Sequence, residues 1–154
     1  MSDNISFNQR PYAHRYSVMG DTAEAAFERV NPNAHRLGVK RPEFSILSLP
    51  PVLRHAPDYM MATGLYEVMG ISSRGDGTLK LKLEKIESLQ KWAMFGPCHL
   101  WVWDSGKKRF YCTDINTWVT ACHMHATIEK FPDNDKPFWK LHFKDFPVEP
   151  NSGI

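Results

Sequence analysis

The sequence predicts an α/β fold with a mixed central sheet, and three observations lead to that prediction. An early helix, three strand candidates, a long amphipathic helix and a further strand follow one another within the first two thirds of the chain. The composition, with 42% hydrophobic and 23% charged residues, is that of an ordinary globular domain. A length of 154 residues suits one domain with a substantial core. We therefore expect a single domain over residues 1–154, with a core at about 20–104 and an extension at 105–154.

The first half of the predicted core contains one helix and three strands. Asp21 as N-cap and Glu24 at the third helical position form a capping-box-like pair, so a helix is expected from residue 21 to about Val30. The expected strands are Phe44–Leu49, His55–Met61 and Leu65–Ile71. The connection Ala62–Gly64 is short enough only for a hairpin turn.

The second half of the chain is expected to continue with a helix, a strand pair, another helix and a last edge strand. In order, the expected elements are a loop at Ser72–Gly77, a helix at Leu79–Phe95, strands at His99–Asp104 and Arg109–Cys112, a helix from Asp114 to about Lys130, and a strand at Phe138–Phe143. The C-terminal helix and strand are appended to the core. The aromatic run at 101–103 is expected to be a buried core strand.

Charge, cysteine content and hydropathy narrow the class of protein. The net charge of +2 permits a polyanionic partner without requiring one. Three widely separated cysteines argue against a disulfide framework and suit a reducing compartment. No apolar run approaches the roughly 18 residues of a membrane span, and the first residues lack the profile of a secretory signal. We therefore expect a cytoplasmic protein that does not associate with membranes.

Two carboxylates, Asp58 and Glu67, fall on the two arms of the predicted hairpin. With a two-residue turn at Thr63-Gly64, Asp58 would pair with Met69, and Glu67 would be its diagonal neighbour on the same face, about 7–8 Å away. Carboxylates at that separation can converge on one hard cation. Mg²⁺ commonly takes one or two carboxylates and fills its other positions with water and phosphate oxygens. The hairpin therefore predicts a metal site.

These motifs resemble those of the PD-(D/E)xK nuclease superfamily. Pro57-Asp58 is similar to the PD element, Glu67-Val68-Met69 occupies the (D/E)xK element, and Gly20–Glu24 is similar to the acidic helix before the core. The order α-β-β-β-α-β over just over half of the chain is also that of the family's core. The resemblance implies a restriction-endonuclease-like fold. It also implies a Mg²⁺-dependent hydrolase, with Mn²⁺ able to substitute, that cuts DNA as an endonuclease.

The resemblance also implies roles for individual residues. Asp58 and Glu67 would hold the metal ion, assisted by the backbone carbonyl of Val68. Glu24 would complete the acidic shell, and Gln90 would steady the attacking water. The resemblance makes DNA the expected partner. Because small members of this fold often dimerise, a homodimer is the expected assembly.

One departure from the family pattern is Met69, which stands at the position of the usual lysine and carries no charge. In some relatives a lysine from a neighbouring element supplies the ammonium group. The helix expected from residue 79 offers three lysines. Lys82 is favoured because it shares the helical stripe of Ile86, Leu89 and Ala93; Lys80 is second and Lys85 third.

Each of these residues also has a purely structural interpretation. Asp58 can be a strand-edge residue, Glu24 a capping glutamate, and the three lysines a solvated helix face. The main functional alternative, kept open by Met69, is a catalytically inactive nuclease-fold module that binds DNA or a protein partner. The third is an unrelated α+β binding domain.

Overall fold

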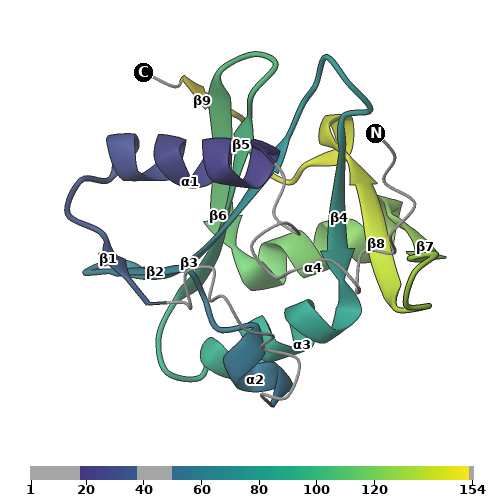
Figure 1. Ribbon diagram of the computed structural model, residues 1–154, viewed down its shortest axis with the longest axis horizontal. Helices are drawn as coiled ribbons and strands as arrows, with labels where there is room; N and C mark the ends of the chain where they lie inside the picture. The colour runs from purple at the N-terminus through teal and green to yellow at the C-terminus, as the bar shows by residue number, and fades with distance from the viewer. Residues whose placement is uncertain (1–17, 38–49, 153–154) are drawn as a thin grey trace, which may run out of the picture.

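The computed structural model describes residues 18–37 and 50–152, which form two β-sheets and four α-helices (Figure 1). In chain order the elements are α1 (Val18–Val30), β1 (His35–Arg36), α2 (Pro51–Arg54), β2 (Tyr59–Met61), β3 (Gly64–Ile71), β4 (Thr78–Lys82), α3 (Leu83–Trp92), β5 (Cys98–Asp104), β6 (Arg109–Asp114), α4 (Ile115–His125), β7 (Thr127–Lys130), β8 (Pro137–His142), a 3₁₀ turn (Phe143–Asp145) and β9 (Asn151–Ser152). The strand expected at Phe44–Leu49 lies outside the described residues. None of the described helices is both long and apolar enough to span a membrane.

The larger sheet is mixed, as predicted. Its strand order is β1-β2-β3-β5-β6-β9, in which β3 and β5 run parallel and the other neighbours antiparallel. The smaller sheet, β4-β8-β7, is antiparallel. Helix α1 covers one face of the larger sheet, and α4 lies between the two sheets, in contact with β5, β6 and β8 (Figure 1). The molecule is therefore a layered α/β structure.

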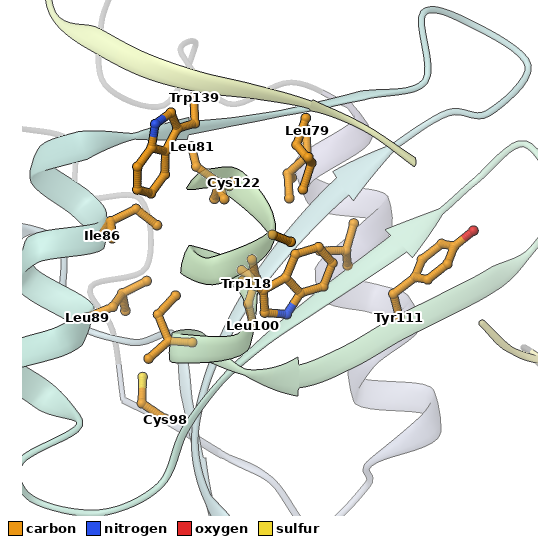
Figure 2. Packing of buried hydrophobic residues seen from close by; sticks show 14 of the residues in the cluster. Leu79, Leu81, Ile86, Leu89, Cys98, Leu100, Tyr111, Trp118, Cys122 and Trp139 are labelled. Carbon is orange, nitrogen blue, oxygen red and sulfur yellow. The ribbon is translucent and has the colours of Figure 1, made fainter. Parts of the chain in front are cut away.

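Apolar side chains form one core on each face of the larger sheet. The α1 side joins Ala23, Ala26, Phe27, Tyr59, Val68, Trp101 and Trp103. On the opposite side, β3, β5, α3, α4 and the smaller sheet share one cluster, in which Trp118 of α4 lies beside Leu100 (Figure 2). Trp101 and Trp103 are each 2% exposed, so the predicted core strand is confirmed.

The helix predicted over 79–95 begins only at Leu83, so the prediction is wrong for its first four residues. Leu79 and Leu81 are buried and Lys80 is exposed, which is the two-residue alternation of a strand. These residues form β4, which pairs with β8 (Leu81 opposite Trp139). The tertiary pairing explains why a segment that also fits a helical stripe becomes a strand.

The predicted capping box at Asp21 and Glu24 is also wrong. Helix α1 already includes Val18, so Asp21 lies inside it and Glu24 cannot be the third helical residue. The Glu24 carboxylate instead accepts a hydrogen bond from Arg36 Nη2 at 3.0 Å. Of the strand expected at His55–Met61, only Tyr59–Met61 forms, because the chain before it belongs to α2 and its connection.

The helix capped by Asp114 is confirmed, but it is shorter than predicted. The Thr117 N–H donates to Asp114 Oδ2 at 3.0 Å, and the helix ends at His125 rather than near Lys130. Residues 127–130 form β7, which pairs with β8. Strand β8 is therefore the centre of a sheet and not the expected edge.

The β2–β3 hairpin forms with a turn one residue earlier than predicted. Met61 pairs with Gly64, so Ala62 and Thr63 make the turn. Gly64 has φ 136°, and a Cβ there would lie 2.4 Å from the carbonyl oxygen of Pro97. The Leu65 N–H donates to that same oxygen at 2.7 Å. This contact fixes the end of the hairpin against the chain that enters β5.

Candidate functional site

Asp58 and Glu67 come together across the β2–β3 hairpin. The last pair of the ladder is Tyr59 with Tyr66, so one step further Asp58 lies opposite Glu67. The observed register differs by two residues from the predicted one, and an even shift keeps every side chain on its predicted face. The Val68 N–H donates to Asp58 Oδ2 at 2.9 Å. The hairpin therefore places the two carboxylates as neighbours.

Glu67 faces α3 and is held by a lysine of that helix. Its neighbours two residues away, Leu65 and Met69, belong to the core on the α3 side, so Glu67 points the same way. Lys85 Nζ donates to Glu67 Oε2 at 2.6 Å, and the Glu67 side chain is only 3% exposed. The other carboxylate oxygen, Oε1, is buried without a hydrogen-bond partner. One oxygen of this carboxylate thus has hydrogen-bonding capacity that the described residues do not use.

The electrostatics of the pair favour additional positive charge. Burial, followed by the nearby charge of Glu67, raises the pKa of Asp58 to about 8, although Lys85 and the Val68 hydrogen bond act in the opposite direction. Burial likewise raises the pKa of Glu67, against the effect of Lys85. Because the two groups titrate together, the pair retains a proton at neutral pH. A bound cation would take the place of that proton.

The lysine in contact with Glu67 is Lys85, the third of the three expected. Lys80 is exposed on β4. Lys82 sits at the N-cap position of α3, and its ammonium lies 5.5 Å from the centre of the Phe131 ring. The choice of lysine depended on where the helix begins. On a helix that begins at Leu83, Lys85 lies one turn before buried Leu89 and so faces the core side.

Glu24 and Gln90 stand apart from the Asp58–Glu67–Lys85 site. Glu24 is engaged on the α1 face, where Arg36 donates to it and also, at 3.0 Å, to the hydroxyl of Tyr59. Its charge nevertheless contributes to the raised pKa of Asp58 and of Glu67. Gln90 is exposed and follows Lys85 by five residues, which is about 140° around the helix. The roles implied for both residues remain predictions.

A second group of charged side chains beside the site was not predicted. Glu84 of α3 accepts a hydrogen bond from Lys136 Nζ at 2.8 Å and lies 3.1 Å from His55 Nε2. Arg54 Nη2 is 3.8 Å from the other oxygen of Glu84. Burial, and then the charge of Lys85, lowers the pKa of His55 to about 4, so its imidazole is neutral at pH 7. Lys136 is 52 residues from Glu84, and nothing local in the sequence links the two.

The residues present fit Mg²⁺ better than a metal that needs several side-chain ligands. Over 18–37 and 50–152, no three His, Cys, Asp or Glu side chains gather closely enough to hold an ion. Mg²⁺ requires only one or two carboxylates, and Glu67 Oε1 is buried and unpaired. The Val68 N–H points to Asp58, and the carbonyl of a strand residue points to the same edge as its N–H. Asp58, Glu67 and the Val68 carbonyl would therefore hold the ion.

Comparisons of the chain with protein-family models, with curated proteins and with solved structures give no match. The site itself combines the buried carboxylate of Glu67, the half-buried carboxylate of Asp58, one ammonium group and a nearby neutral imidazole. Such a set can bind a cation and can stabilise negative charge on a bound group.

Proposed function

We propose that the protein is a divalent-metal-dependent deoxyribonuclease that hydrolyses phosphodiester bonds at the Asp58–Glu67–Lys85 site. The observation that carries this proposal is the 2.6 Å contact between Lys85 Nζ and Glu67 Oε2. It supplies from α3 the ammonium group that Met69 cannot provide. The mixed α/β fold and the antiparallel β2–β3 hairpin are compatible with a restriction-endonuclease-like core, which is part of the proposal.

The two carboxylates serve the reaction by binding a cation. Asp58 and Glu67 would hold it, and because the cation would displace the proton that the raised pKa of Asp58 retains, its binding would improve as the pH rises toward 8. The chemistry that bound Mg²⁺, or Mn²⁺ in its place, would supply is charge neutralisation at the scissile phosphate and a lower pKa of water. The Val68 N–H fixes the orientation of Asp58 by donating to one of its oxygens.

Lys85 serves the reaction by stabilising negative charge. Glu67 orients its ammonium group, and the low exposure of that carboxylate strengthens the interaction. As negative charge builds up on the phosphate oxygens during attack, an ammonium group beside them lowers the barrier. One preorganised donor of this kind contributes about 2.7–4 kcal/mol, or roughly 10²–10³ in rate.

Cleavage of plasmid DNA tests the proposal. The purified protein should nick or linearise the plasmid with Mg²⁺ or Mn²⁺ and not with EDTA. Asp58→Asn and Glu67→Gln should abolish cleavage, because both changes keep the shape and remove the charge that binds the ion. Glu87→Gln, an exposed carboxylate of α3, is the matched control and should cut at the wild-type rate. Undiminished cleavage by either site variant would rule out these residues as ligands.

A nuclease-fold module without catalysis is the second candidate. The closed Glu67–Lys85 ion pair favours it, because the lysine already neutralises the carboxylate without a metal. This candidate predicts DNA or protein binding in EDTA and no cleavage with any divalent cation. Endonuclease action and a homodimer are further predictions of the nuclease proposal. Product analysis on circular single-stranded and duplex DNA, together with sedimentation, would test them.

A further inference from the structure

Four cationic side chains gather around the first turn of α3. Arg54 ends α2, Lys82 ends β4, Lys85 lies in α3 itself, and Lys136 directly precedes β8. Glu84 joins two of them, since Lys136 Nζ is 2.8 Å and Arg54 Nη2 is 3.8 Å from its carboxylate. Segments from the smaller sheet and two helices therefore contribute to one cluster beside the candidate site.

Within residues 18–37 and 50–152, the four cationic side chains of this cluster share the carboxylates of Glu84 and Glu67. Glu84 is shared by Lys136 and Arg54, and Glu67 is occupied by Lys85. Lys82 is half-buried. Burial is the main cause that lowers its pKa, and the positive charges of Lys85 and Lys136 lower it further. Crowding like charges costs free energy that a bound anion would offset.

We propose that Arg54, Lys82 and Lys136 form a surface that binds the phosphate backbone of DNA next to Lys85. The inference rests on the proposed function for the identity of the anion, and it adds the path of the substrate. The Lys136 side chain is 35% exposed, so a phosphate can approach it without rearrangement of the core. The smaller sheet, of which β7 and β8 lie outside the predicted nuclease core, thereby contributes to substrate binding through β4 and the segment before β8.

The chemistry of these side chains also defines how the DNA is recognised. Lysine contacts to phosphate position a duplex without reading its sequence. Each such contact releases counterions, so affinity falls with salt by a slope of about 0.9 per phosphate. The surface therefore predicts binding that is strongly salt-dependent and indifferent to sequence.

The test measures the affinity for a labelled DNA duplex by fluorescence anisotropy in EDTA, over a series of salt concentrations. We expect Lys82→Gln and Lys136→Gln each to weaken binding equally for different sequences and to reduce the salt slope by about 1, and the double variant by about 2. Lys136→Arg should retain the wild-type slope. Lys130→Gln, a 62% exposed lysine of β7, is the control and should change neither quantity.

Thermal unfolding first establishes that each variant is folded. An unchanged affinity and slope in the folded double variant would overturn the surface, while cleavage by the wild type would still uphold the nuclease proposal. If the variants show a reduced salt slope of DNA affinity but the wild-type protein never cuts DNA, the binding surface would be upheld and the proposed catalysis overturned. Failure of the wild-type protein to bind DNA would overturn the surface.

Discussion

Two buried acids of the larger sheet have opposite electrostatic surroundings. Asp104, at the end of β5, is fully buried and accepts hydrogen bonds from Ser73 N at 2.9 Å, Gly106 N at 3.0 Å and Arg109 Nε at 3.1 Å. Burial alone would raise its pKa, but these donors together hold that pKa below its ordinary value. Asp104 thus ties the loop after β3 to the β5–β6 turn.

Glu67, in the middle of β3, is nearly as buried but has one donor, Lys85, and one unpaired oxygen. Its pKa is raised by burial, and that of neighbouring Asp58 is raised as well. The comparison indicates that the number of donors, rather than burial, decides whether a buried acid is a structural anchor. An acid left short of donors is the better candidate for binding a cation.

The largest effect that would sharpen this comparison is expected at Lys85. Lys85→Met should reduce single-turnover cleavage by roughly 10²–10³, because the charge beside the scissile phosphate is lost. Arg109→Met removes the corresponding cation from Asp104 and should leave the cleavage step unchanged. Lys80→Met and, at saturating DNA, Lys82→Met should also cut at the wild-type rate.

Partial rescue of Lys85→Met by Met69→Lys would support the proposed replacement of the missing lysine. A wild-type rate for Lys85→Met would contradict it.

A smaller effect, on stability, is expected at Asp104. Asp104→Asn should lower the free energy of unfolding by about 2–3 kcal/mol, because the amide cannot accept from all three donors and removes the charge opposite Arg109. Urea denaturation at pH 7 measures the change. The exposed carboxylate variant Glu87→Gln should alter stability by less than about 0.5 kcal/mol. An unchanged free energy of unfolding in Asp104→Asn would contradict the distinction between Asp104 as a structural anchor and Glu67 as a candidate cation ligand.

The smallest effect, and one of opposite sign, is expected at Asp58. Its folded pKa of about 8 exceeds the ordinary value of 3.8, so the folded state holds a proton that the unfolded state has lost between these pH values. Wild-type stability therefore falls as the pH rises from about 4 to 8. Asp58→Asn should flatten that slope. At pH 8 it should add on the order of 1–2 kcal/mol, or about 2–8 °C in Tm. Equal pH profiles by calorimetry would contradict the raised pKa.

Local patterns were sufficient to predict several elements of the fold. The mostly apolar strand β3, the aromatic strand β5 and the Asp114 cap are each encoded within a few neighbouring residues. In contrast, β4 and β7 exist because β8 pairs with both, and all four residues of β7 are exposed. Nothing within 127–130 alone distinguishes a strand from the end of a helix.

The candidate site was predictable to the same extent. That Asp58 and Glu67 lie on one face follows from the two-residue alternation of the hairpin strands. The observed register differs by two residues from the predicted one, and an even shift leaves both side chains on that face. The choice of lysine depended on where α3 begins, and four residues of error were enough to favour Lys82 over Lys85. Glu84 and its partners required the tertiary arrangement, because Lys136 comes from the smaller sheet.

Gly64 makes one further consequence visible, for genetics rather than for chemistry. Any side chain at this position would collide with the backbone oxygen of Pro97, which receives the Leu65 N–H. Glu67 lies three residues further along β3, about 10 Å away, and its alignment with Asp58 depends on the hairpin that Gly64 anchors. In a screen for loss of cleavage, substitutions at Gly64 should therefore be recovered alongside those at the acids. They should be temperature-sensitive, since they misalign the two strands without removing any of the groups proposed to bind the metal.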